Sequence, residues 1–203
     1  TPHSFSLSPT VHSPLSNANL NLNPEPASCV TNVRNTNVIA ADDDPNRNFG
    51  RMYKWRNLQE GFQEAKICRK PIFLLIHKPG CPTCEKLKPK FANSIRILDL
   101  SQRFVMVGVR KGEISAQDEA RFQPDGTYVP RILFFTPDGE FMRDIYNRHP
   151  KADDKYKYFY SSTSQIIDSM ILALERCSEE SLNDVSLTLP LAVAALVTAI
   201  IGS

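Results

Sequence analysis

The feature that most restricts the fold is a short apolar run, Ile72 to His77, that follows Pro71 and precedes a helix-like segment. Because the run has no polar alternation, it is typical of a strand that is buried on both faces. A strand of that kind lies inside a sheet that carries helices on both sides. The helix-like segment begins at once, in KPGCPTCEKLKPKF, Lys78 to Phe91, with two cysteines near its start and Pro89 within it.

The remainder of the region 49–177 alternates between helical and extended patterns. The spacing of apolar residues predicts a first helix over 55–65 and a last helix that begins at the capping box Ser162-x-x-Gln165. Further strands are predicted at 104–109, 129–135 and 140–145, the last of them reached through a Pro-Asp-Gly turn. Alternation followed by a hairpin predicts an α/β fold, a single domain with a central mixed β-sheet flanked by helices.

Both ends of the chain differ from this region. Residues 1–48 are rich in proline, serine and asparagine and contain no apolar run, so we expect a disordered N-terminal arm. Residues 178–188 form a polar linker to an apolar C-terminal tail, 189–203. The apolar part of this tail would span about 20 Å as a helix, against about 30 Å for a bilayer core. The pattern favours a glycolipid-anchor signal, with a docking helix or a short tail anchor as alternatives.

Charge and cysteine content exclude some classes of function. The chain of 203 residues has a formal net charge of +2, which gives no electrostatic case for a nucleic-acid partner. Five cysteines are too few for a small scaffold held by disulfides. Cys68, beside the first buried strand, is expected to be a packed free thiol. Cys29 and Cys177 are expected to be inert or to form intermolecular disulfides.

The pair Cys81 and Cys84 carries the strongest chemical signal. Cys81 stands at the predicted helix N-terminus, where free amides and the helix dipole favour a thiolate. Cys84 lies one turn further on, close enough to form a disulfide with Cys81. A zinc site would need a second pair of Cys or His ligands, and the chain has neither a second Cys-x-x-Cys nor a His-x-x-x-His. The pattern therefore favours a redox pair over zinc or coincidental spacing, and no metal or cofactor is expected.

Several segments together resemble a known family. IHKPGCPTCEKLKPKF, FVMVGV, PDGTYVPRILFFTPDGE and KYKYFY are similar to segments of small thioredoxin-domain proteins of the endoplasmic reticulum. That family comprises thioredoxin domain-containing protein 12 and the anterior gradient proteins. The resemblance covers about Tyr53 to Cys177 and implies a thioredoxin-like fold for residues 49–177.

The resemblance also implies roles for individual residues. Cys81 would attack the substrate and Cys84 would resolve the adduct, with Pro82 and Thr83 completing the active-site motif. Val129 and Pro130 would form a cis-proline loop that faces the two sulfurs and receives the substrate backbone.

Three features of the chain differ from the pattern of such thioredoxin-domain proteins. Gly80 replaces a tryptophan that relatives commonly carry before the first cysteine. Leu75 stands where thioredoxins and protein disulfide isomerases bury an acid, six residues before the first cysteine, that could accept the proton of Cys84. The endoplasmic-reticulum retention sequence is absent, and the apolar tail stands in its place.

The resemblance implies a thiol-disulfide oxidoreductase of the secretory pathway that acts on cysteine-containing client proteins. Glutathione or another thiol would be its redox partner, and the tail would add membrane attachment. The implied location is the endoplasmic reticulum lumen or the secretory pathway, anchored to a membrane or secreted. The alternative hypothesis is a non-catalytic adapter or chaperone of the anterior gradient type.

Overall fold

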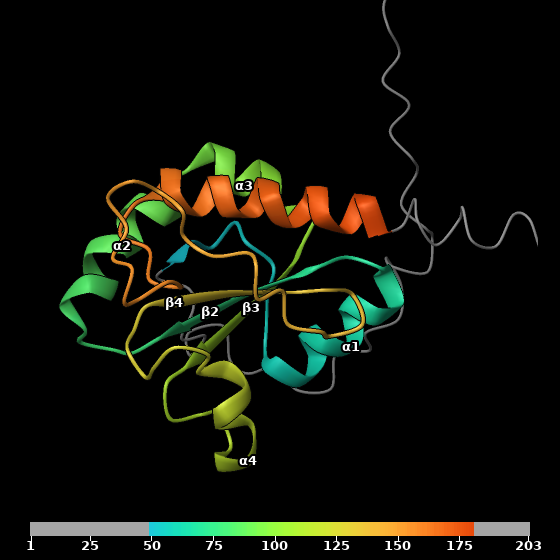
Figure 1. The fold of residues 1–203 in the computed structure, drawn as a ribbon, viewed down its shortest axis with the longest axis horizontal. Coiled ribbons are helices and arrows are strands. Elements are labelled where there is room, and N and C mark those ends of the chain that lie inside the picture. Colours follow the sequence, from blue (N-terminus) through green and yellow to red (C-terminus); the bar gives the residue numbers. More distant parts are fainter. Residues whose placement is uncertain (1–48, 181–203) are drawn as a thin grey trace, which may run out of the picture.

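The structure is a computed structural model, and it describes residues 49–180 (Figure 1). The predicted arm over 1–48, the apolar tail and most of the linker lie outside the described residues. Among residues 49–180, no helix is both long enough and apolar enough to cross a membrane.

A four-stranded mixed sheet forms the centre of the domain. Its strands are β1 (Trp55–Arg56), β2 (Ile72–His77), β3 (Val105–Arg110) and β4 (Arg131–Phe135), in the spatial order β1-β3-β2-β4. Strand β2 pairs in parallel with β3 and antiparallel with β4, so that Ile72 lies opposite both Val105 and Phe135. Every residue of β2 is buried, as its continuous apolar run predicts.

Helices cover both faces of the sheet. They are α1 (Leu58–Cys68), α2 (Pro82–Ala92), α3 (Ile95–Ser101), the short α4 (Ala116–Glu119) with the 3-10 turn η3 (Ala120–Phe122), and a C-terminal helix whose described part is 163–180. Figure 1 shows α3 and the C-terminal helix (orange) over one face and α1 over the other. The predicted α/β architecture is therefore confirmed.

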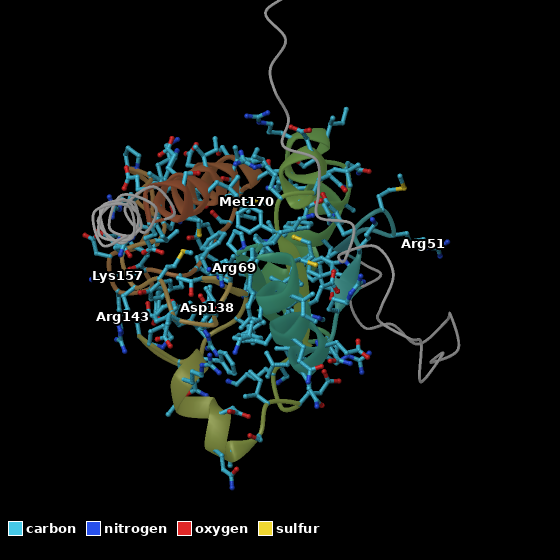
Figure 2. All side chains as sticks on the ribbon, turned by 90° about the vertical axis from the view of Figure 1, so that its right-hand side faces the viewer. Arg51, Arg69, Asp138, Arg143, Lys157 and Met170 are labelled. Atoms are coloured by element: carbon cyan, nitrogen blue, oxygen red, sulfur yellow. The ribbon has the colours of Figure 1, made fainter. Side chains whose placement is uncertain are left out.

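Alternate residues of β2 divide the core in two. Phe73 and Leu75 point to the layer of α2, α3 and the C-terminal helix, where Met170 is fully buried (Figure 2). Ile72, Leu74 and Ile76 point to the layer of α1. Successive side chains of a strand point to opposite faces of the sheet, and in β2 the residues on both faces are apolar.

Helix α2 is held against the sheet through Phe91. The hydroxyl group of Tyr53 donates a hydrogen bond to the backbone oxygen of Phe91 at 2.8 Å. The rings of Phe49, Tyr53 and Phe73 lie 4.9 to 5.9 Å from the Phe91 ring, centroid to centroid. Aromatic packing of this kind adds to the burial of apolar area and fixes where α2 begins relative to β2.

Two predicted elements differ from the structure. Trp55 was expected on the first helix but lies in β1, because Asn57 caps α1 by accepting the Glu60 amide at 2.8 Å. The predicted strand over 140–145 is reduced to a single bridge between Phe135 and Phe141. The backbone turns soon afterwards, with the amide of Ile145 bonded to the carbonyl oxygen of Met142.

The C-terminal helix begins where the capping box predicts. The side-chain oxygen of Gln165 accepts the backbone N–H of Ser162 at 3.2 Å and that of Ser161 at 2.8 Å. At the end of α1, Arg69 lies beside Asp138, Nη1 to Oδ1 2.8 Å (Figure 2). Both side chains of this ion pair are largely exposed, so its contribution to stability is small.

Gly61 provides a test of the packing between α1 and β3. A Cβ atom at this position would overlap Cγ2 of the buried Val107. We predict that Gly61→Ala lowers the free energy of unfolding by about 1–3 kcal/mol through overpacking. We expect this loss although alanine stabilises a helix by about 1 kcal/mol relative to glycine. Urea unfolding measures the change.

A double-mutant cycle identifies the cause. Val107→Ala removes the methyl group with which the new Cβ collides, so the double variant should lose less stability than the two single losses added together. A Gly61→Ala protein at least as stable as the parent would contradict the close packing of α1 on β3.

Candidate active site

The two cysteines lie at the junction between β2 and α2. Strand β2 ends at His77 and α2 begins at Pro82, so that Cys81 is the N-cap residue of the helix. Pro82 suits the first helical position because its ring fixes φ and its missing N–H is not needed there. Gly80 turns the chain toward the helix with φ of +70°, a left-handed conformation that glycine adopts without strain. A Cβ atom at Gly80 would meet no other atom within 4 Å. Glycine is therefore favoured here by the backbone conformation and not by a lack of space.

Cys81 is the more accessible and the more acidic of the two thiols. Its sulfur is partly exposed and lies 3.0 Å from Oγ1 of Thr83 and 3.7 Å from the carbonyl oxygen of Val129. Partial burial by itself opposes ionisation. Hydrogen bonds from the Thr83 hydroxyl and the Cys84 backbone favour the thiolate and hold the pKa of Cys81 below its ordinary value. These donors belong to the first turn of α2, as the sequence pattern predicts.

Cys84 is fully buried in the core that contains Leu75 and Leu87. Burial raises the pKa of Cys84 to about 12, and the adjacent Cys81 sulfur acts in the same direction. The backbone of Lys78 and the charge of Lys88 oppose the rise. At neutral pH the pair therefore consists of a reactive outer sulfur and a protonated inner one.

The loop that precedes β4 faces these sulfurs. The peptide bond between Val129 and Pro130 is cis, as the family resemblance implies. The Val129 carbonyl oxygen lies 3.3 Å from Thr83 Oγ1, so the single proton of this hydroxyl can be donated to Val129 or, when Cys81 is a thiolate, to the Cys81 sulfur. The structure thus places the predicted motif, Cys81 to Cys84, next to Val129 and Pro130. Thr83 and Val129 are in contact although they lie 46 positions apart in the sequence.

Arg131 holds the loop before β4 in place, although no motif in the sequence marks this residue. Although it is only 1 % exposed, its Nη1 donates to the carbonyl oxygens of Gly126 at 2.8 Å and Tyr128 at 2.7 Å. The hydroxyl of Tyr128 lies 2.7 Å from both carboxylate oxygens of Asp125. A charged residue at the start of a buried strand is the signal that could have identified Arg131, because a buried guanidinium needs acceptors nearby.

Leu75 stands where the family pattern has a buried acid, and a basic group lies on the helix instead. Lys88 is 8 % exposed and donates to Oε1 of Glu85 at 2.6 Å. As the residue one turn after Cys84, it shares a face of α2 with that thiol. His77 is also buried; burial, helped by the charge of Lys88, lowers its pKa to about 4, so that its ring is neutral at physiological pH.

Cys68 and Cys177 belong to other elements, the end of α1 and the C-terminal helix, and Cys29 lies outside the described residues. The prediction that Cys68 is a packed free thiol is wrong, because Cys68 is disulfide-bonded. Cys68 is the last residue of α1 and is buried, and burial beside a strand does not distinguish a packed thiol from a disulfide. Cys177 is half-buried on the C-terminal helix, where burial raises its pKa to about 11. Within residues 49–180, no group of three or more His, Cys, Asp or Glu side chains could hold a metal ion.

The chain is similar to known proteins over most of the described residues. Residues 52–137 match a family model described as thioredoxin-like. The human anterior gradient protein 2 homolog is 29 % identical over 135 residues, which cover 66 % of this chain and 74 % of that protein. Residues 52–137 are thus similar to a thioredoxin-like domain, and the chain is similar to the anterior gradient proteins. Mouse anterior gradient protein 3 is likewise 29 % identical, over 66 % of this chain and 79 % of its own length.

Solved structures with similar coordinates were also found. The oxidoreductase DsbH superposes with a TM-score of 0.44 at 18 % identity, covering 61 % of this chain and 85 % of its own. A thioredoxin from Thermus thermophilus superposes with a TM-score of 0.44 at 14 % identity, covering 61 % and 88 % of the two chains.

The unequal thiols predict how alkylation by iodoacetamide depends on pH. Because the pKa of Cys81 is lowered, its thiolate should persist below the value of about 8.5 that is usual for cysteine. Alkylation of Cys81 should fall only as the pH drops through that lowered pKa, while Cys84, with a pKa of about 12, stays unreactive. Mass spectrometry of the labelled peptides measures both rates.

Thr83 supplies the matched control. Thr83→Ala removes the hydroxyl donor and should slow alkylation at pH 7 by roughly three- to tenfold, whereas Thr83→Ser keeps the donor and the rate. Equal rates for the alanine and serine variants would show that this hydroxyl does not stabilise the thiolate.

Proposed function

We propose that the protein is a thiol-disulfide oxidoreductase that acts on protein cysteines through Cys81 and Cys84. The observation that carries the proposal is the pairing of an accessible thiol of lowered pKa with a buried thiol one turn away. The cis peptide bond at Pro130 and the relationship to the anterior gradient proteins support it. We further propose, from this relationship, that the protein works in the secretory pathway.

In the reducing direction, the Cys81 thiolate attacks one sulfur of a client disulfide. A bond forms between Cys81 and that sulfur, the client disulfide breaks, and its other sulfur leaves as a thiolate. Cys84 then loses its proton and attacks Cys81, which releases the second client thiolate. The client gains two electrons, and the protein keeps an internal disulfide until glutathione or another thiol reduces it. The oxidising direction reverses these steps.

The second step needs a Cys84 thiolate in an apolar environment. Burial is the largest obstacle, since it raises the pKa of Cys84 to about 12. The Lys88 ammonium on the same helix face favours the thiolate, as a positive charge in a partly buried site does. Lys88 accepts no proton itself while it is charged, so we assign it the stabilisation of the thiolate and not its deprotonation.

The trapping of client proteins tests the assigned roles. Cys84→Ser should leave attack intact and stop resolution, so mixed disulfides with clients should accumulate on Cys81. Cys81→Ser should abolish both trapping and the reduction of insulin. Non-reducing electrophoresis followed by peptide mapping identifies the attached cysteine. Equal trapping by the two variants would reverse or remove the assignment.

Lys88 should affect resolution more than attack. Replacing Lys88 by Met keeps the buried stem but removes the charge, and we expect the mixed disulfide on Cys81 to be resolved a few-fold more slowly. Lys88→Arg keeps the charge and should resolve at close to the parent rate. Rapid-quench measurement separates the two steps; a slower first step with an unchanged second step would contradict the assignment.

An adapter that binds clients without turnover is the second candidate, and Leu75 is the observation that favours it. With leucine in place of the buried acid, Cys84 has one proton acceptor fewer. Insulin reduction distinguishes the two functions. Turnover supports the oxidoreductase, while retained peptide binding with no turnover supports the adapter.

A further inference from the structure

A groove of about 420 Å³ lies beside the Cys81 sulfur. Three segments line it: residues 78–82 before α2, Lys111 after β3, and residues 127–129 before the cis proline. The groove therefore contains both the reactive sulfur and the backbone of Val129. A client segment that presents a disulfide to Cys81 must lie along this groove.

The charged residues that line the groove are both lysines. Lys78 comes directly after β2 and is exposed, and its ammonium group has no acidic partner among residues 49–180. Lys111 is also exposed, but its Nζ donates to the carbonyl oxygen of Thr127 at 2.7 Å. This bond holds the Lys111 charge at the groove wall and leaves two of its three N–H donors for a ligand.

Acidic side chains on adjacent segments have other partners, and Glu85, whose carboxylate also interacts with the backbone of Gly80, pairs with Lys88 at 2.6 Å. Glu113 pairs with Arg110, accepting its backbone N–H at 3.0 Å and lying 3.8 Å from its guanidinium. Asp125 accepts the hydroxyl of Tyr128 and the backbone N–H of residue 157. The positive charge of the groove is therefore not neutralised by Glu113 or Asp125.

We propose that the groove selects extended client segments with aspartate or glutamate close to the reactive disulfide. The inference rests on the proposed oxidoreductase function and names its substrate class. A carboxylate beside the client cysteine would meet the charges of Lys78 and Lys111, which line the same groove as Cys81. The two lysines follow the adjacent ends of β2 and β3, where the backbone N–H of Lys111 donates to the carbonyl oxygen of His77 at 2.7 Å, and the same groove contains the Cys81 sulfur and Val129.

The size of the effect follows from the exposure of the two lysines. An exposed ion pair contributes up to about a fivefold change in an equilibrium or rate constant. Two such pairs should make an acidic client react roughly tenfold faster than a basic one at low salt. Screening by about 0.5 M salt should remove most of this preference.

The test uses the full chain, reduced beforehand, and three fluorogenic peptides that differ only beside their disulfide. The flanking residues are glutamate, glutamine or lysine, and single-turnover reduction is measured at low and high salt. The ratio of glutamate to glutamine rates is the readout, because any change in the intrinsic reactivity of Cys81 cancels in that ratio.

The variant Lys78→Gln with Lys111→Gln should bring the three rates to within about twofold of one another. Lys78→Glu with Lys111→Glu should reverse the order, so that the lysine peptide becomes the fastest. Lys66→Gln with Lys90→Gln makes the same change in net charge at exposed sites outside the groove and should keep the parent preference.

The outcomes separate this inference from the proposed function. A preference for acidic peptides that the groove variant loses and the control variant keeps supports the inference. Equal rates for all three peptides overturn it and leave the oxidoreductase function standing, as does a preference that survives in the groove variant. If the parent protein reduces none of the peptides, the proposed function fails, and the inference with it.

Discussion

The pairing of β2 on both of its edges is the constraint on which the rest of the structure depends. Parallel pairing with β3 and antiparallel pairing with β4 place all six residues of β2 inside the sheet. Because a strand in that position cannot move without breaking two ladders, the turn that leaves it is fixed as well. Cys81 is thus held just beyond the C-terminal end of β2, and the cis proline directly before β4 lies at the same end of the sheet. The site is built from the ends of two neighbouring strands.

The difference between the two cysteines arises from one turn of helix. Cys81, as the N-cap residue, lies where backbone amides are unpaired and solvent is near, so ionisation is favoured. Cys84 belongs to the face of α2 that packs on the sheet, so ionisation is opposed. The anchoring of α2 by Phe91 maintains both environments together, since Cys81 caps this helix and Cys84 lies within it. Packing far from the sulfurs therefore determines their chemistry.

The sequence predicted those parts of the fold that local patterns determine. The run over β2 identified a central strand, and the capping box at Ser162 identified the start of the last helix. Trp55 was misplaced because apolar spacing alone does not show that a cap at Asn57 begins the helix later. Of the site, the cysteine pair was visible as a motif, whereas Arg131 was not. Its role depends on carbonyl groups of its own loop that only the folded backbone turns toward it.

The replacement of a buried acid by Leu75 changes how the inner thiol can be activated. A carboxylate beneath Cys84 could accept its proton but would oppose the thiolate by its own negative charge. Lys88 does the reverse: it favours the thiolate and offers no site for the proton. Its partner Glu85, 2.6 Å away and half exposed, does carry an acceptor, although the hydrogen bond from Lys88 lowers the pKa of that carboxylate and weakens it as a base. The arrangement stabilises the Cys84 thiolate more than it assists the removal of the Cys84 proton, so in the proposed reaction the resolving step would depend on the charge of Lys88.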